Sequence, residues 1–303
     1  MTTPATYRLT DGLGERRIAA DPSHGLVEVL ELAPELATRS GVAALIERRA
    51  SVVGSLDGVV AHVHGVARQG AAVFVTADLP RGLRLSTLLG IAASRHERLS
   101  ETVVLHVAQA LMRSLATLHR HVEPFVHGAI CPDHIVLTPD GDAVFTDAAF
   151  GAVLPDLEYS RERLWKTFGL AMPAAASLPR FDQRADVTQL AAVILAVAIR
   201  RHLTEADFPR AVPELLASVM APAAPDALER ASQFRAWLQR ALQLPSRGVF
   251  SSALDAERSL TPLVGSSSRE TRAAVSALVR ELTMPEADGA PVVNVGGQYC
   301  RSA

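Results

Sequence analysis

Residues 126 to 149 constrain the fold of this chain more than any other stretch. They begin V-H-G-A-I-C-P-D-H-I-V-L and, after a short turn, end V-F-T-D-A-A. Two short β-like segments, 134–138 and 142–147, flank the sequence P-D-G at 139–141, a strong turn signal that predicts a small hairpin. Because helical patterns precede and follow this hairpin, we expect a few strands set among many helices.

The region before residue 78 reads as a small β-rich unit. Its predicted elements are β-like segments over 7–9 and 26–32, a helix over 41–53, and strands over 59–64 and 72–76. The sequence D-L-P-R-G that follows breaks the pattern and is typical of a hinge. We therefore expect a first lobe over residues 7–78.

Beyond the hinge the pattern becomes helical. The most apolar run, residues 190–199, is too short to span a bilayer, so we interpret it as a buried core helix. A second lobe is expected over 79–282, and residues 283–303, rich in small residues, are expected to form a flexible tail. The predicted helices cover residues 83–92, 100–121, 186–202, 210–220, 226–243, 251–260 and 268–282.

Composition narrows the possible binding partners and the expected cellular location. A formal net charge of -2 gives no general attraction to nucleic acid or to an anionic membrane, so neither is expected as a partner. Lys166 is the single lysine among many arginines, which together with abundant alanine suggests a GC-rich bacterial genome. The N-terminus lacks the pattern of a signal peptide, so a cytoplasmic location is expected, and Met1 favours a true start.

The stretch 126–149 resembles the catalytic segment of a protein kinase, which reads H-R-D-L-K-P-x-N and then D-F-G. Residues 181–190, F-D-Q-R-A-D-V-T-Q-L, are similar to the kinase segment that opens a buried helix with an aspartate. The resemblance covers roughly residues 7–260. It implies an α+β, protein kinase-like bilobal fold with a reduced β-rich N-lobe and a mostly helical C-lobe.

Three residues receive structural roles from this resemblance. Asp186 should cap its own helix and hold the loop around His127 by accepting backbone N–H groups. His127 is interpreted as a core histidine of that loop. Arg247 corresponds to the arginine that follows a late kinase helix, although the glutamate that usually pairs with it is missing.

The resemblance also shows which reactive groups are replaced. Ala129 stands where a kinase has its catalytic base, Cys131 replaces the lysine of the catalytic loop, and His134 replaces the asparagine that holds a metal ion. Leu30 stands where the third-strand lysine would hold the nucleotide phosphates. The glycine-rich loop is reduced to residues 12–17, without a third glycine in register.

A few positions could still contact a ligand. Asp147 stands at the aspartate of D-F-G, Glu47 falls where the kinase helix glutamate would lie, and Asp78 lies in the hinge. Glu15, by contrast, would repel a phosphate because both groups are negatively charged. Residual binding of ATP with magnesium therefore stays open at Asp147, but a magnesium site of this type normally uses more than one protein ligand. No cofactor is expected.

Two sets of residues have a spacing that could form a metal site. His127, Cys131 and His134 have the spacing H-x3-C-x2-H, and His62 and His64 lie two apart on a predicted strand. Kinase-loop geometry would point the first set in different directions, and the second reads as a partly exposed structural pair. We therefore expect no metal site.

The resulting expectation is a pseudokinase, a catalytically inactive kinase-like protein that acts as a regulator or scaffold of a protein partner. Each lost electrostatic element costs about ten- to a thousandfold in rate, and at least three are lost here. Two alternatives stay open. One is an atypical ATP-dependent phosphotransferase or nucleotidyltransferase that uses Asp147, and the other is a kinase-like domain that senses a small ligand in the cleft.

Overall fold

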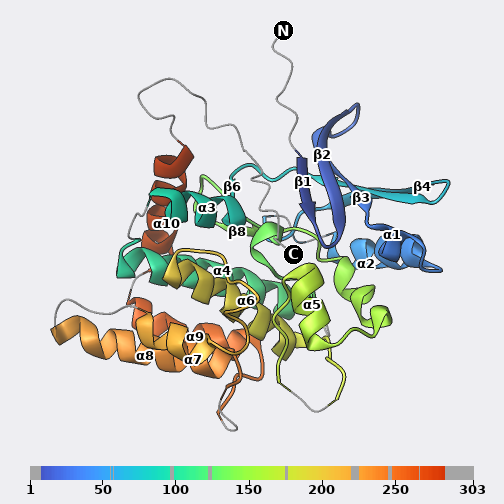
Figure 1. The fold of residues 1–303 in the computed structure, drawn as a ribbon. Coiled ribbons are helices and arrows are strands. Elements are labelled where there is room, and N and C mark those ends of the chain that lie inside the picture. Colours follow the sequence, from blue (N-terminus) through green and yellow to red (C-terminus); the bar gives the residue numbers. More distant parts are fainter. Residues whose placement is uncertain are drawn as a thin grey trace.

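The protein folds into two lobes, a β-rich N-lobe and a larger helical C-lobe, in a computed structural model (Figure 1). The expected α+β bilobal architecture is confirmed. The residues that the structure describes are 8–54, 56, 58–95, 99–121, 125–174, 177–219, 225–244, 248–265 and 267–283.

The N-lobe is built on one antiparallel sheet of five strands in the order β1-β2-β3-β5-β4. Two helices, α1 (Pro34–Ala37) and α2 (Val42–Val53), follow the third strand. The alternation of buried and exposed residues along the strands gives the sheet one face toward the C-lobe and one toward solvent. The strands are β1 (Arg8–Asp11), β2 (Gly14–Asp21), β3 (Gly25–Leu32), β4 (Val63–Gln69) and β5 (Ala72–Asp78).

Two expectations for this lobe were wrong. Residues 12–17 were interpreted as a reduced glycine-rich loop, but most of them belong to strand β2 (Gly14–Asp21), which pairs with β3 along its whole length. Strand β4 begins at Val63 rather than at residue 59, because the preceding residues pair elsewhere. The backbone N–H of Phe145 donates to Val59 O at 2.8 Å, and Ala61 N–H donates to Phe145 O at 2.8 Å. This segment thus joins the N-lobe to the C-lobe hairpin.

The C-lobe opens with a short sheet, β6 (Leu83–Arg84), β7 (Ile135–Leu137) and β8 (Ala143–Phe145), in that spatial order. The hairpin expected at 139–141 is therefore confirmed. Helix α5 was not predicted, because its sequence R-E-R-L-W-K-T-F carries few apolar residues. The helices are α3 (Leu85–Arg95), α4 (Glu101–His121), α5 (Arg161–Phe168), α6 (Gln183–Ile199), α7 (Val212–Ser218), α8 (Pro225–Ala241), α9 (Ala253–Val264) and α10 (Ser268–Thr283).

Helix α6 is the centre of the C-lobe and is buried along nearly its whole length. It lies among α4, α8 and α9, as its uniformly apolar sequence requires. Its N-cap is Asp182, whose carboxylate accepts the Ala185 N–H at 2.9 Å, so the expected capping role of Asp186 is wrong. Within the part of the chain that is described, no helix combines the length and the apolarity needed to cross a bilayer.

The apolar core of the N-lobe extends into the C-lobe sequence. Residues 149–172, which we call the covering segment, run beneath the N-lobe sheet and include α5 (Figure 1). Their buried side chains belong to the same apolar cluster as Leu13, Leu36 and Ile46 of the N-lobe. The two lobes therefore share a core. The covering segment contributes Ala149, Phe150, Val153, Leu154, Leu157, Tyr159, Leu164, Phe168, Leu170 and Met172 to it.

Candidate functional site in the interlobe cleft

A buried arginine occupies the cleft between the lobes. Arg16 lies in the middle of β2, and its side chain is only 1% exposed, whereas its neighbours Glu15 and Arg17 face solvent. The period of two along a strand explains this, since successive side chains point to opposite faces. Glu15, expected to oppose a phosphate, instead pairs with Arg8 at 3.1 Å on the outside of the sheet.

Three carboxylates surround the Arg16 guanidinium. Its Nε lies 3.0 Å from Asp11 Oδ2, and its Nη1 lies 3.0 Å from both Glu28 Oε1 and Asp147 Oδ1. The three acidic side chains come from β1, from β3 and from the D-A-A sequence that follows β8. A planar guanidinium with five N–H donors suits such multiple bonding, which a lysine could not reproduce.

Two further cations complete this group. Arg84 of β6 donates to Glu28 Oε2 and to the backbone oxygen of Asp133. His134 Nε2 lies 3.1 Å from Asp11 Oδ2, while its Nδ1 lies 2.6 Å from Ala129 O. The two shorter contacts of His134 are to acceptors, which suits a cationic imidazole that donates from both ring nitrogens, and Arg16 Nη2 lies further away, at 3.5 Å from Nε2. We call these six residues the Arg16 cluster: Asp11, Arg16, Glu28, Arg84, His134 and Asp147.

The Arg16 cluster balances its own charge, with three carboxylates against two guanidinium groups and one imidazolium. Burial alone would raise the pKa of Asp147, but Arg16 and His134 outweigh it and hold the pKa below its usual range. Burial would lower the pKa of His134, yet Cys131, Asp147 and Asp11 together raise it well above its usual value. Asp147 and His134 are therefore charged at neutral pH, and each is paired inside the protein.

Little free space remains around the Arg16 cluster. The cavity lined by Arg16, Glu28 and Asp147 has a volume of about 10 Å³, roughly that of one water molecule. Sites for small molecules usually measure about 300–1,000 Å³. The cleft in this structure is therefore filled by the protein's own side chains.

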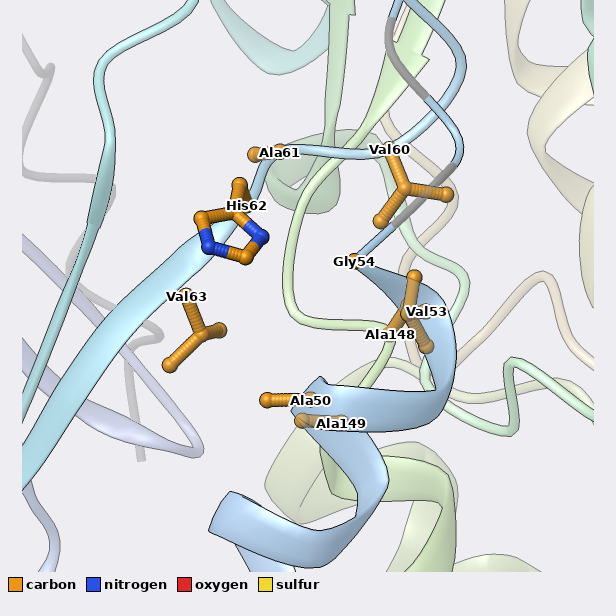
Figure 2. A pocket seen from close by; sticks show the side chains of 9 residues that line it. All are labelled: Ala50, Val53, Gly54, Val60, Ala61, His62, Val63, Ala148 and Ala149. Carbon is orange, nitrogen blue, oxygen red and sulfur yellow. The ribbon is translucent and has the colours of Figure 1, made fainter.

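A second small space lies between α2 and the D-A-A sequence. Figure 2 shows Ala50 of α2 beside Ala149, with the His62 ring across from them. This cavity also measures about 10 Å³. Small side chains line it on several sides, and it is too small for an organic ligand.

Asp147 is held in a fixed and unusual backbone conformation. Its φ of 65° is in the left-handed region, where aspartate is one of the few non-glycine residues tolerated. The Thr146 hydroxyl donates to Asp147 Oδ2 at 2.6 Å, and Arg16 binds the other oxygen. Both carboxylate oxygens thus have partners within the protein.

The other two positions considered for a ligand do not join this group. Glu47 of α2 is exposed to solvent. Its expected partner position on the third strand, Leu30, is buried in the N-lobe core with Ile46. Asp78 lies at the rim of the cleft, where its Oδ1 is 2.9 Å from His64 Nε2 and its Oδ2 accepts the His62 N–H. The structure therefore brings only Asp147 of the three into contact with Arg16.

Helix α2 is attached to the C-lobe through Arg49, a residue that the sequence analysis did not single out. Its Nη2 donates to Val126 O at 2.7 Å, and its guanidinium carbon lies 3.9 Å from the centre of the Phe125 ring. The cation–π contact with Phe125 in this partly buried site stabilises the attachment of α2 beyond what the hydrogen bond alone provides.

The loop before β7 is organised by Asp186. Its carboxylate accepts the backbone N–H groups of His127 and Gly128, each at 2.7 Å, and lies 2.9 Å from His119 Nε2. Ala129 and Cys131, which were expected to replace polar kinase residues, are buried in the apolar cluster of the N-lobe. Arg247 lies outside the described residues. No group of three or more potential metal-binding side chains occurs among the residues that the structure describes.

His127 makes folding stability depend on pH. Burial lowers its pKa to about 4, against a smaller opposing effect of Asp186. The neutral ring fits its contacts, since Nε2 lies 3.0 Å from Thr146 O and Nδ1 accepts the Ala129 N–H. As the pH falls from 6.5 toward 4, the unfolded chain binds a proton that the folded protein does not, so stability is lost in this window.

Because of His127, we expect the free energy of unfolding to fall by an amount on the order of 3 kcal/mol as the pH is lowered from 7 to 4. Urea unfolding across this range should show a steeper fall for the wild-type protein than for His127→Gln, whose amide does not titrate. Equal slopes for the two proteins would contradict the assignment of a neutral, buried His127.

Comparison with solved structures places this architecture among known folds. The kinase domain of Mycobacterium tuberculosis PknI is similar with a TM-score of 0.60 at 17% sequence identity, over 86% of this chain and 94% of that domain. A second structure of the same domain gives a TM-score of 0.56 at 17% identity, over 87% and 98% of the two chains. No family model matches the chain, and no curated protein does.

The chain has a protein kinase-like fold. This confirms the expectation drawn from the segments at 126–149 and 181–190, although an identity of 17% establishes the fold alone. In this kinase-like fold the Arg16 cluster lies between the β1–β2 hairpin and the D-A-A sequence. Four of its members, Asp11, Arg16, Glu28 and Arg84, were not singled out from the sequence. Reading 14–21 as a strand would have placed Arg16 and Glu28 on one face of the sheet.

Proposed function

We propose that this kinase-like domain is catalytically inactive and acts by binding a protein partner, as a regulator or scaffold. The observation that carries the proposal is the ion pair between Arg16 and Asp147 at 3.0 Å, inside a cluster with no net charge. We propose that the protein is located in the cytoplasm of a bacterium.

The pairing leaves the one retained acidic position without the means to bind magnesium and nucleotide. A magnesium ion at Asp147 would compete with a guanidinium already bonded to that carboxylate, and a phosphate would face Asp11 and Glu28. Rearranging the cluster would leave buried charges unpaired, which costs several kcal/mol per ion. Positioning and charge neutralisation supply most of the catalysis in phosphoryl transfer, and here they are absent or reversed.

The replaced residues support the same proposal. Ala129 is buried and has no group that could accept a proton from a substrate hydroxyl. Leu30 packs against apolar side chains where a kinase presents a lysine to the phosphates. The alternatives of an atypical transferase and of a ligand sensor both require the cleft to open, and a volume of about 10 Å³ gives no support to either.

We expect phosphate transfer from radiolabelled ATP, to the protein itself or to added protein substrates, to stay at the level of a reaction without protein. Asp147→Asn, which keeps the size of the side chain and removes its charge, is the matched control. Magnesium-dependent transfer by the wild-type protein that disappears in Asp147→Asn would overturn the proposal.

A further inference from the structure

The last described helix, α10, covers the turn of the β7–β8 hairpin. Arg272 Nε lies 2.7 Å from Asp142 Oδ1, and the Ser276 hydroxyl donates to Pro139 O at 2.5 Å. A Cβ atom built on Gly141 would lie 2.0 Å from Arg272 O, and the φ of Gly141 is 83°, so space and backbone conformation both favour glycine at this contact. The turn thus offers α10 a carboxylate, a backbone acceptor and a surface without a side chain.

The inner face of α10 packs against α4. Two buried members of this face are polar, Thr271 and Ser276, and Thr271 Oγ1 lies 3.2 Å from Nδ1 of His106, which is buried on α4. The buried residues share one side of the helix, so α10 is amphipathic and makes its contacts through a single face. The apolar residues of this face, which belong to the cluster that fills the C-lobe, are Val275, Leu278, Val279 and Leu282.

This contact has the composition of a separable interface. The side chains of Thr271, Ser276 and His106 can all bond to water when α10 is away, whereas α6 is mainly apolar and is buried on all sides. Interfaces between separable parts of a chain are more polar than obligate ones. Elements with few buried apolar contacts also open locally at a lower free energy than the core of a protein does. Helix α10 is therefore suited to leave and re-enter its place while α6 stays folded.

We propose that the surface beneath α10, formed by the α4 face around His106 and the β7–β8 turn, is a docking site for an amphipathic helix of a protein partner. Helix α10 occupies this site in the unbound protein. Recognition of a helix through its apolar face in a groove is a recurring mode of protein binding. Because the site would serve the partner binding proposed above, the inference rests on the proposed function.

The contacts of α10 define the chemistry of the partner helix. It should carry an arginine opposite Asp142 and, four positions later, a small hydroxyl residue that reaches Pro139 O. An apolar stripe on the same side should cover the face of α4 that α10 covers here. A bulky or acidic side chain near the turn would be rejected, because Gly141 brings the two backbones close together and Asp142 is negatively charged.

The test measures, by fluorescence anisotropy, the binding of a fluorescein-labelled peptide with the sequence of residues 268–283. The whole 303-residue chain is used as wild type, Val279→Asp and Ala277→Asp. Val279 is 1% exposed on the inner face, so a buried aspartate there should displace the chain's own α10. Ala277 is exposed on the same helix and provides the control. In the wild-type protein the tether keeps α10 at a high effective concentration, so the free peptide competes poorly.

We expect the peptide to bind Val279→Asp at least about tenfold more tightly than it binds the wild-type protein or Ala277→Asp. A peptide with glutamate in place of Arg272 should bind Val279→Asp about threefold more weakly or worse, because its carboxylate would face Asp142. Equal binding to all three proteins, no binding to Val279→Asp, or equal affinities of the two peptides would overturn the proposal.

Amide hydrogen exchange decides if Val279→Asp does not fold. In the wild-type protein, α10 should exchange at least about tenfold faster than α6 after correction for intrinsic rates. Arg272→Glu should raise exchange in α10 about threefold or more and leave α6 unchanged, because it opposes Asp142 at an exposed position. Equal protection of the two helices, no change in α10, or an increase shared by both would overturn the proposal. No nucleotide is used, so a failure here is distinguishable from a failure of the proposed function.

Discussion

Replacing Arg16 with methionine should lower the free energy of unfolding at pH 7 by about 3–5 kcal/mol, the usual cost of leaving buried charges unpaired. The guanidinium is bonded to Asp11, Glu28 and Asp147, all of which lie in the interior of the cleft. Methionine fills a similar volume without providing a charge. Urea unfolding at constant ionic strength would measure the difference.

Arg17→Met is the matched control, because Arg17 is the next residue on the same strand and faces solvent. It should change stability by less than about 0.5 kcal/mol, as is usual for surface substitutions. The pKa values of Asp11 and Asp147 are held below their usual range, so the stability they contribute is present at neutral pH and is lost in acid. The effect of Arg16→Met should therefore shrink below pH 4. A loss under 1 kcal/mol at pH 7 would contradict the arrangement described.

Replacing Asp186 with alanine should cost about 3–5 kcal/mol. The carboxylate satisfies two buried backbone N–H groups, those of His127 and Gly128, and the His119 ring. Each buried donor left without a partner costs about 1–3 kcal/mol. Chemical denaturation followed by the fluorescence of the two tryptophans would measure the loss.

Asp182→Asn is the control for this second substitution. Asp182 lies on the same turn and caps α6, and asparagine is an equally good cap, so little change is expected. A result in which Asp186→Ala and Asp182→Asn have the same small effect would show that Asp186 does not organise the loop.

The fold could be predicted to a large extent because its strongest signals are local. The P-D-G turn, the uniformly apolar run at 190–199 and the aspartate that precedes it lie within short stretches of sequence. Strand β2 and helix α5 could not be recognised in this way. The sequence G-E-R-R-I-A-A-D lacks a clear apolar alternation because its inward residue is Arg16, and α5 buries only Leu164 and Phe168.

The candidate site depends on contacts between distant parts of the chain. The sequence predicts that Ala129 and Leu30 replace a catalytic base and a third-strand lysine. What occupies the cleft instead could not be predicted, since Arg16 and Asp147 are 131 residues apart. An arginine paired with three carboxylates from different elements leaves no periodic signal in the sequence. The structure therefore explains how Asp147 is engaged, whereas the sequence shows only that it is retained.

The proposed function requires that the Arg16 cluster leaves no room for a nucleotide in the cleft, and nucleotide binding tests this most directly. A ligand that binds only the folded state at a hundred times its dissociation constant stabilises that state by about 2.7 kcal/mol. We predict that 5 mM ATP, with or without magnesium, leaves the melting temperature unchanged. A saturable, magnesium-dependent increase that is lost in Asp147→Asn would contradict the claim.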